Sequence, residues 1–363
     1  MRICFFTDTF FPLVGGAEMV LHHLASELKH SGHEPVVLAP RIRGGKTGLA
    51  TDYPVHRYTP PSSKRLLIRQ MLLPLAWLHS RYRFGVLHCH AGYPQAYVGA
   101  TFTRLFRVPM VVRPHGSDIV PGGRIRQHPR LEKRLSKGLK SAAAIIAQGS
   151  YLSGLIKELG VPAEKIHIIH NGVAVNAFRN TNPFPHGRPY IVALGNLIHR
   201  KGFDILLRAF AGLESREIDL LIAGDGPEQD ALASLAHDLG INKRVRFLGF
   251  VEGQTKADLL GSARLMVCPS RNEPFANAIL EGLAAGIPII ASAVGGNTQL
   301  IEHNERGLLF QSEDVTGLTA ELQSLLADRP LQETMRQNIR QYIQQFDWKY
   351  VAQKYLDVYN AVI

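Results

Sequence analysis

Two glutamates stand eight positions apart in the second half of the chain, and they could bind a hydroxyl-rich ligand. Glu273 follows a predicted buried strand at residues 264–268, and Glu281 precedes another at residues 288–291. Pro274 suits the first turn of a helix, which would place free amides around residues 276–278, where a phosphate could be held. Carboxylates accept hydrogen bonds from sugar or ribose hydroxyls. The alternative is a helix-capping Glu273 and a solvated Glu281.

Glycines and cations at two other predicted strand ends could bind phosphate. Arg200 and Lys201 stand at the start of a predicted helix, and two adjacent cations beside helix amides suit a diphosphate. Gly15 and Gly16 follow the first strand and open the first long helix, where they allow an anion to approach the backbone closely. Each pattern has a plainer interpretation, namely a solvated pair of cations and a tight turn. No GxGxxG sequence follows the first strand, so the dinucleotide fingerprint is absent.

Histidines at strand ends could add a further ligand contact. His115 follows the predicted strand at residues 109–114 and could point into a cleft between domains; the alternative is a histidine bonded to the backbone. His88 and His90 alternate with Cys89 along another strand, so both histidines face one side of the sheet, and a metal triad is not expected. The absence of a CxxC pair and of a disulfide framework among the cysteines, at positions 4, 89 and 268, indicates a reducing compartment.

Short apolar strands and amphipathic helices alternate along the whole chain. Their order predicts two doubly wound α/β domains with parallel sheets, which agrees with a length of 363 residues. We expect domains at residues 1–182 and 187–345, separated by a segment at 180–189 rich in Asn, Pro, Gly and His, and a closing helix at about 346–363. The predicted strands lie at residues 2–7, 35–39, 86–90, 109–114, 143–147, 166–170, 189–194, 218–223, 245–249, 264–268, 288–291 and 307–310, and clear helical segments lie at 17–31, 203–213 and 228–239.

Positive charge is concentrated in the first half of the chain. The net charge is +11, and residues 1–180 contain 24 Lys and Arg against 9 Asp and Glu. This imbalance predicts an anionic partner for the first half. A nucleic acid is not favoured, because no recognition motif is present and residues 181–363 are slightly acidic.

Two basic stretches could form that contact. Residues 124–140 contain seven cations and one acid. Residues 64–83 combine five cations with several leucines and Trp77, a composition typical of a segment at a membrane surface; the alternative is a partly buried helix with a solvated basic face. Pro74 argues against a single straight helix there. No apolar run is long enough to span a membrane, and the N-terminus does not resemble a signal peptide, so we expect a cytoplasmic protein.

In their order along the chain, these motifs resemble those of the glycosyltransferase family 4 proteins, retaining enzymes of the GT-B fold that use nucleotide sugars. The resemblance extends over essentially the whole chain, and its most specific part is Glu273 and Glu281 with the Gly-Ile-Pro strand that follows. It implies two Rossmann-like domains that face each other across a cleft. The other motifs that carry it are Gly15-Gly16-Ala17-Glu18, His115-Gly116-Ser117-Asp118, His170-Asn171-Gly172-Val173, Arg200-Lys201-Gly202, Gly224-Asp225-Gly226-Pro227-Glu228 and Phe346-Asp347-Trp348.

The resemblance implies that the second domain binds the donor. Glu273 would bind hydroxyls of the donor sugar, and Glu281 would accept hydrogen bonds from the ribose. Arg200 and Lys201 would neutralise the departing diphosphate, while His115 would face the reacting sugar. These three residues and Glu273 are the expected catalytic residues. The other expected donor-binding residues are Gly15, Gly16, Asn196, Val251, Phe275, Ala276 and Asn277, of which Asn196 stands where relatives commonly have an arginine.

The resemblance also implies that the basic N-terminal domain binds the acceptor. We expect transfer of a hexose from a UDP-sugar, or less favourably from GDP-mannose, to an anionic or lipid-linked saccharide or lipid at the inner membrane surface. No cofactor and no obligatory metal are expected, since no Asp-x-Asp cluster stands in a suitable loop. The alternatives are a sugar-nucleotide 2-epimerase of the same fold and a non-catalytic nucleotide-sugar-binding protein. The expected acceptor-side residues are Glu18, His90, Asp118, Arg124 and Arg126.

Overall fold

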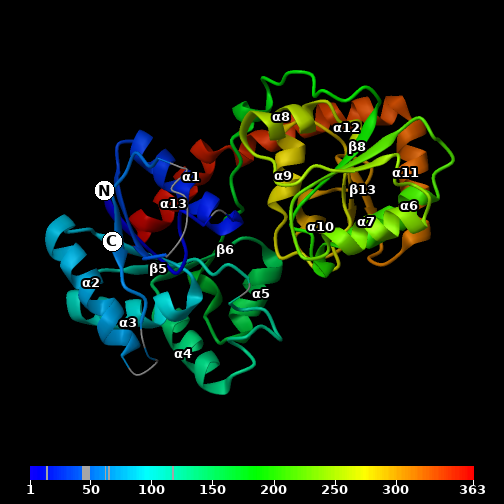
Figure 1. Cartoon of the computed structure of the whole chain (residues 1–363). Helices are drawn as coiled ribbons and strands as arrows, with labels where there is room; N and C mark the ends of the chain where they lie inside the picture. Colours follow the sequence, from blue (N-terminus) through cyan, green and yellow to red (C-terminus); the bar gives the residue numbers. More distant parts are fainter. Residues whose placement is uncertain (14, 43–49, 62, 64–65, 117) are drawn as a thin grey trace. The chain divides into compact units, whose positions relative to one another are not determined.

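The chain divides into two compact units, each built around one parallel β-sheet (Figure 1). The computed structural model describes residues 1–13, 15–42, 50–61, 63, 66–116 and 118–363. Unit 1 comprises Met1–Gly172 and Trp348–Ile363, and unit 2 comprises Val173–Asp347. The division falls before the expected boundary at residues 180–189, because the short helix η3 (Val175–Phe178) packs against two helices of unit 2.

Unit 1 contains a seven-stranded sheet in the order β3-β2-β1-β4-β5-β6-β7. Its strands are β1 (Arg2–Thr7), β2 (Glu34–Pro40), β3 (Val55–Tyr58), β4 (Val86–His90), β5 (Met110–Val112), β6 (Ala144–Ala147) and β7 (Ile166–Ile168). The order reverses direction between β1 and β4, which are neighbours in the sheet. Its helices are α1 (Gly16–His30), α2 (Leu67–Tyr82), η1 (Gly92–Ala96), α3 (Tyr97–Phe106), α4 (Pro129–Lys140), α5 (Ser150–Glu158), η2 (Ala163–Lys165) and α13 (Trp348–Val362).

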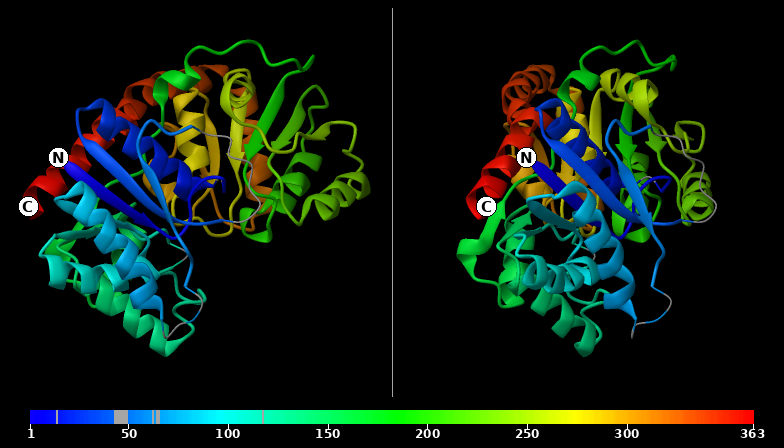
Figure 2. Two further views of the ribbon diagram at one scale, coloured as in Figure 1. Left: turned by 60° about the vertical axis from the view of Figure 1, so that its left-hand side comes forward. Right: turned by 90° about the vertical axis from the view of Figure 1, so that its left-hand side faces the viewer.

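Unit 2 repeats this plan with a six-stranded sheet in the order β10-β9-β8-β11-β12-β13, and Figure 2 shows helices on both faces of it. Its strands are β8 (Tyr190–Leu194), β9 (Asp219–Ala223), β10 (Val245–Phe247), β11 (Leu265–Cys268), β12 (Ile289–Ser292) and β13 (Gly307–Phe310). Its helices are η3, η4 (His199–Lys201), α6 (Phe203–Ala211), α7 (Gln229–Asp238), α8 (Gly253–Gly261), α9 (Asn277–Ala284), α10 (Asn297–Leu300), α11 (Val315–Ala327), α12 (Arg329–Tyr342) and η5 (Ile343–Phe346).

The predicted α/β class is confirmed, and all twelve predicted strands are present with small differences at their ends. β3 was not predicted. It is a four-residue edge strand that contains His56 and Arg57, so it lacks the apolar run that marks the others. Its neighbour β2 is buried almost throughout, because helices cover both faces of a parallel sheet.

Two helices of unit 1 were the subject of predictions: α2, in the expected membrane segment, and the closing helix α13. α2 continues through Pro74 as one helix, and Met71, Leu75 and Leu78 bury its inner face in the core of unit 1. Lys64 and Arg65, which belong to the expected membrane segment, lie outside the described residues. The closing helix α13 packs beside α1, and its Trp348 ring stacks on His23 with the ring centroids 5.6 Å apart.

Candidate active site

The strand order of unit 2 places the loops after β8 and β11 side by side at the point where the sheet changes direction. Ligands of open parallel sheets bind beyond the carboxyl ends of the strands at this point. The loop after β8 carries Gly195, Asn196 and the short helix η4, which ends at Lys201. The loop after β11 carries Glu273. The topology therefore brings together two motifs that are 72 positions apart in the sequence.

Glu273 and Lys201 form a largely buried ion pair. The Lys201 ammonium donates to Oε2 of Glu273, and the two side chains are 19% and 6% exposed. The Ser270 hydroxyl lies 3.5 Å from the same oxygen. Arg200 reaches Oε1 of Glu273 at 3.9 Å and donates to the carbonyl of Asn272 at 2.9 Å, while its side chain stays 44% exposed. A paired carboxylate and a partly accessible cation thus lie at one edge of the sheet.

A glycine turn after β12 fixes the backbone of Glu273. The N–H of Gly296 donates to the Glu273 carbonyl at 2.8 Å. Gly295 adopts φ +47°, and a Cβ at this position would lie 2.2 Å from that carbonyl oxygen, so only glycine fits. We did not predict this contribution, although two adjacent glycines in the loop that follows a strand are the same signal as Gly15 and Gly16.

The predicted helix after Glu273 begins later than Pro274 indicated. α9 starts at Asn277, with Ala276 in an extended conformation at its N-cap, so Pro274 lies in the preceding loop and the first-turn prediction for it is wrong. Its carbonyl and the next residue pack closely against Gly296. The first amides of α9 still belong to residues 277 and 278, and the first N–H groups of a helix have no carbonyl partner within it.

Glu281 lies on α9 and pairs with a lysine from α8. Its Oε1 accepts from the Lys256 ammonium at 2.6 Å, and both side chains are about one quarter exposed. Val251 lies in the loop between β10 and α8, partly buried against the core of unit 2. Phe275 is also partly buried against this core. Glu281 and Val251, the residues expected at the ribose and the base, therefore lie on α9 and on the loop that leads into α8, the helix whose Lys256 pairs with Glu281.

An arginine that the sequence did not identify links the loops of this site. Arg271 donates to both oxygens of Asp204, at 2.7 and 2.8 Å, and to Glu313 at 2.5 Å. These hydrogen bonds lower the pKa of Asp204 and raise that of Arg271. Its guanidinium also donates to the His199 carbonyl at 2.8 Å, which fixes η4 beside the Glu273 loop. Gly202 allows this close approach, because it has φ +67° and a Cβ there would lie 2.1 Å from the Pro269 oxygen.

Asn196, which stands where relatives commonly have an arginine, is exposed just after β8. Its carbonyl accepts from the N–H of Ile198 at 2.9 Å. Gly195 before it has φ +147°, and its carbonyl packs so closely on Gly224 that a Cβ on Gly224 would lie 2.0 Å away. The Gly224 turn is thus structural.

In unit 1, the expected residues gather at the corresponding edge of the first sheet. Gly15 is the N-cap of α1, Gly16 begins the helix, and Glu18 lies in its first turn. His90 ends β4 and donates through Nε2 to the Ala17 carbonyl at 3.1 Å. Burial lowers the pKa of His90 well below its ordinary value.

His115 and Asp118 are joined through the backbone. Asp118 is buried; its two oxygens accept from the N–H groups of Gly92 at 2.5 Å and His115 at 3.0 Å. The His115 ring contacts Arg113 through Nδ1 at 3.1 Å and the His90 carbonyl through Nε2 at 2.8 Å. The alternative interpretation, a histidine bonded to the backbone, is therefore correct for Nε2, whereas Nδ1 contacts a side chain. Ser117 lies outside the described residues.

The two expected acceptor-side arginines differ in their surroundings. Arg126 pairs with Glu132 at 3.0 Å and Glu158 at 3.6 Å and donates to the Ile119 carbonyl at 3.2 Å, so its contacts are structural. Arg124 is exposed near the start of α4. Of these two side chains, Arg124 is the better placed to meet a ligand.

A cavity of about 380 Å³ lies at the carboxyl ends of β1, β2 and β3 in unit 1. Its polar lining includes Asp8, Tyr58 and Gln95, and its apolar lining includes Leu13 and Met71. Desolvation, together with the charge of Asp118, raises the pKa of Asp8 to about 6, although the residue keeps contact with solvent. Gln95 is fully buried, and its Oε1 lacks a hydrogen-bond partner in the part of the chain that the structure describes.

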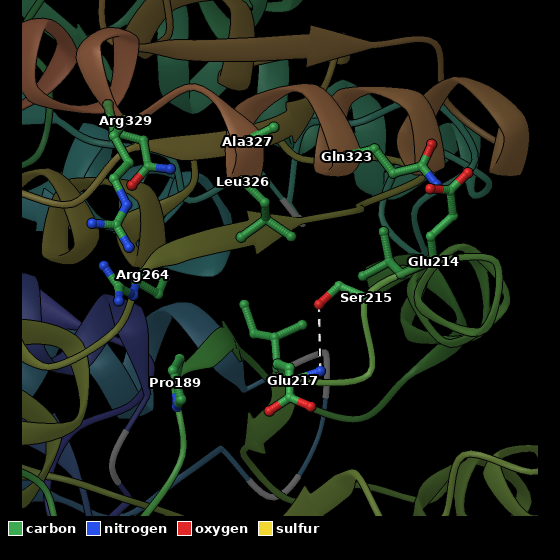
Figure 3. Close-up of a pocket in the computed structure, with 12 residues that line it drawn as sticks. Pro189, Glu214, Ser215, Glu217, Arg264, Gln323, Leu326, Ala327 and Arg329 are labelled. Carbon is green, nitrogen blue, oxygen red and sulfur yellow. Dashed lines mark hydrogen bonds between the residues drawn. The ribbon is translucent and has the colours of Figure 1, made fainter.

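A larger cavity of about 480 Å³ occupies the opposite edge of the unit 2 sheet, where β8, β9 and β11 begin (Figure 3). Arg264 and Arg329 lie on one side of it, and Glu214 and Glu217 on another. None of the expected site residues lines it. Separately, the described residues contain no group of three or more His, Cys, Asp or Glu that could hold a metal ion. Nor does any helix among them combine the length and apolarity that crossing a bilayer requires.

Comparison with known families assigns both parts of the chain. Residues 14–177 match the family described as Glycosyltransferase Family 4, and residues 175–342 match Glycosyl transferases group 1. The fold and these matches define a glycosyltransferase of the GT-B type. The chain belongs to the group 1, family 4 glycosyltransferases.

Two relatives and one solved structure illustrate matches that cover nearly the whole chain. N-acetyl-alpha-D-glucosaminyl L-malate synthase of Bacillus anthracis is 27% identical over 98% of this chain and 96% of its own length. A lipopolysaccharide core biosynthesis glycosyltransferase of Rhizobium meliloti is 26% identical over 95% of both. The crystal structure of Anabaena HepE with UDP-glucose has a TM-score of 0.81 at 21% identity and covers 99% of this chain and 100% of that one, which shows the shared fold.

Proposed function

We propose that this glycosyltransferase moves a hexose from a UDP-sugar to an anionic or lipid-linked acceptor, with retention of configuration and without an obligatory metal ion. The observation that carries the donor half is the Lys201–Glu273 pair at the switch point of the unit 2 sheet. The preference for UDP draws support from HepE, whose structures contain UDP and UDP-glucose. GDP-mannose is the second candidate donor.

The donor site divides the nucleotide sugar among the elements of unit 2. Glu273 accepts hydrogen bonds from sugar hydroxyls, and Glu281 accepts from the ribose. The amides of the N-cap Ala276 and of the first α9 residues, 277 and 278, approach the phosphates, and Val251 meets the base through its backbone. Lys201 and Arg200 counter the charge that develops on the leaving diphosphate, which is the usual dominant contribution in such sites.

The proposed transfer step retains the configuration of the anomeric carbon. The bond from the anomeric carbon to the β-phosphate oxygen breaks, and the acceptor oxygen forms its bond to that carbon on the same face. The acceptor proton passes to the departing phosphate oxygen, so UDP leaves as the other product. This route needs no side-chain nucleophile and no metal ion, and the cations of η4 lower the barrier by stabilising the leaving group.

The acceptor half is assigned to unit 1. Its cavity beside β1 offers Asp8 and the buried Gln95 to hydroxyl groups, and Arg124 offers a charge to an anionic group. The excess of cations in the first half of the chain favours an anionic acceptor.

A lipid-linked acceptor is supported by the outer surface of α2 and α3. Leu73 and Trp77, one helical turn apart, are 60% and 54% exposed, and Leu105 and Phe106 at the end of α3 are also exposed. Arginines at positions 69, 81, 83, 104 and 107 stand on or directly after these two helices. Apolar side chains among arginines suit an anionic lipid surface, which we infer to be the inner face of the membrane.

Thermal unfolding with UDP-, GDP-, ADP- and dTDP-sugars tests the donor assignment. A ligand at about 100 times its Kd adds about 2.7 kcal/mol to the stability of the folded state. We expect stabilisation by the UDP-sugar, loss of it in Glu281→Ala, and retention of it in Glu217→Ala, a matched control at the opposite edge of the same sheet. Equal stabilisation of both variants would refute the site. The anomeric configuration of the product, determined by NMR in EDTA, tests retention and metal independence.

Vesicle sedimentation tests the membrane surface. Vesicles with anionic lipid should bind the protein at low salt and release it as the salt concentration rises. The double variant Leu73→Ser/Trp77→Ser should lose binding, while Phe250→Ser, which alters a 60% exposed side chain of unit 2, should keep it. Equal binding by all three proteins would refute this surface.

A further inference from the structure

Arg113 is a buried cation that the proposed reaction does not yet use. It follows β5 directly and is only 1% exposed. Its guanidinium donates from Nε to the Tyr355 hydroxyl at 3.0 Å, contacts Nδ1 of His115 at 3.1 Å and donates to Oδ1 of Asn171. In the part of the chain that the structure describes it forms no close ion pair with a carboxylate, although its charge partly offsets the burial that raises the pKa of Asp118. Burial of a charge under these conditions is expensive, which makes a purely structural role unusual.

These contacts determine where the proton of His115 lies. A guanidinium has only donors, so Nδ1 of His115 must accept the hydrogen bond and cannot carry a proton. In a neutral imidazole the proton is then on Nε2, and Nε2 donates to the His90 carbonyl at 2.8 Å. Both the tautomer and the orientation of the ring are therefore fixed by partners on two strand ends.

We propose that Arg113 is a positioning residue that keeps His115 as the neutral Nε2–H tautomer, and that Tyr355 and Asn171 hold Arg113 for this purpose. The inference rests on the proposed function and on the expectation, implied by the family resemblance, that His115 faces the substrate. His115 is then a hydrogen-bond donor to a substrate oxygen, which replaces the His90 carbonyl as its partner. It does not act as a general base, because its only lone pair is occupied, nor as a general acid, because a neutral imidazole holds its remaining proton too tightly.

The surroundings of His115 keep it neutral over the working pH range. Burial and the adjacent Arg113 charge lower the pKa of His115 to about 3. His90 packs edge-on against its ring with the centroids 4.3 Å apart, and His88, from the same strand, also has a lowered pKa. The Asp118 carboxylate accepts from the His115 backbone. The Tyr355 hydroxyl faces Arg113.

The helix α13 supplies both the test variant and its control. Tyr355 bonds to Arg113, while Tyr359, one turn later, bonds to Nδ1 of His88 at 2.6 Å. Both tyrosines are fully buried. Phenylalanine at either position removes one hydroxyl and keeps the ring, so the two variants differ only in which hydrogen bond is lost.

Imidazole ¹⁵N NMR of the full-length protein tests the inference without relying on activity. His115 is assigned by the signal missing in His115→Gln. In the wild type, His115 should show the Nε2–H tautomer and should not titrate between about pH 5 and 8. In Arg113→Met it should sample both tautomers and titrate closer to the ordinary histidine pKa of about 6.5. Tyr355→Phe should shift in the same direction, Arg113→Lys should restore part of the effect, and Tyr359→Phe should leave His115 unchanged.

A titrating His115 in the wild type, or an unchanged tautomer in both Arg113→Met and Tyr355→Phe, would overturn the inference. Should Arg113→Met fail to fold, Tyr355→Phe decides the question alone. In turnover, kcat of Arg113→Met should fall about 5- to 10-fold, the effect of losing the hydrogen bond from neutral His115 to a substrate oxygen. Its pH profile should show a new inflection. If the NMR result holds but no variant, nor the wild type, transfers sugar, the proposed function fails and the positioning role of Arg113 stands.

Discussion

Replacement of Lys201 by methionine should destabilise unit 2 in a way that can be calculated from the site. The change keeps most of the volume of the side chain but leaves the Glu273 carboxylate, only 6% exposed, without its main partner. Removal of one member of a buried ion pair typically costs about 3–5 kcal/mol. Arg200 at 3.9 Å and Ser270 at 3.5 Å remain as weaker partners, so we expect about 3 kcal/mol. For a unit of this size that corresponds to a fall in Tm of about 6–12 °C.

The two tryptophans make the measurement specific to one unit. Trp77 and Trp348 both belong to unit 1, so their fluorescence follows that unit alone, while far-UV circular dichroism follows both. Urea unfolding of Lys201→Met should shift the dichroism transition to lower urea and leave the fluorescence transition in place. An equal shift of both signals would contradict the assignment of the effect to unit 2.

A double-mutant cycle tests the cause of the loss. In Lys201→Met/Glu273→Gln the buried charge is gone and the amide can still bond to Ser270, so the double variant should recover to within about 1 kcal/mol of the wild type. Additive losses from the two single variants would refute the reasoning, because they would mean that the two side chains stabilise unit 2 independently.

Three further changes have outcomes that the structure defines. Gly202→Ala should destabilise the protein by more than Gly286→Ala in urea unfolding, because both glycines have positive φ but only a Cβ on Gly202 meets backbone, at 2.1 Å, whereas nothing lies within 4 Å of one on Gly286. Lys256→Ala should lower the free energy of unfolding by less than about 1 kcal/mol and retain UDP-sugar stabilisation in thermal unfolding, since it leaves Glu281 able to accept from ribose; loss of that stabilisation would count against the site. Folding raises the pKa of Asp8 to about 6, so ionisation above that pH opposes folding, and Asp8→Asn should raise Tm near pH 8 but not near pH 4; no difference between the two pH values would disprove the shift.

The sequence predicted the architecture well because both sheets are buried on their two faces. Such strands are short continuous apolar runs, and every one of the expected runs is a strand. β3 was missed because an edge strand needs no apolar run. Pro74 does not end α2, because the local preference against a proline within a helix is outweighed by the burial of Met71, Leu75 and Leu78 against the core.

The candidate site was predictable in its positions but not in its pairings. Motifs at strand ends identified Glu273 and Lys201 separately, since parallel strands place their carboxyl ends at one edge. Their ion pair depends on which strands are neighbours, which the sequence does not state. Arg113 was counted as part of a strand, although a charged residue within a buried run was itself a signal. Its partner Tyr355 lies 242 positions further along the chain, beyond any local pattern.

The discontinuous composition of unit 1 has a consequence for biosynthesis. The ribosome completes the first 172 residues of unit 1, then all of unit 2, and only afterwards Trp348–Ile363. At about 5–20 residues per second, the intervening 175 residues take about 9–35 s. During this interval Arg113 and His88 lack the tyrosine hydroxyls that bind them in the finished protein. The nascent first unit therefore lacks α13 during this interval and remains accessible to chaperones. It can be completed only after the second unit has been translated.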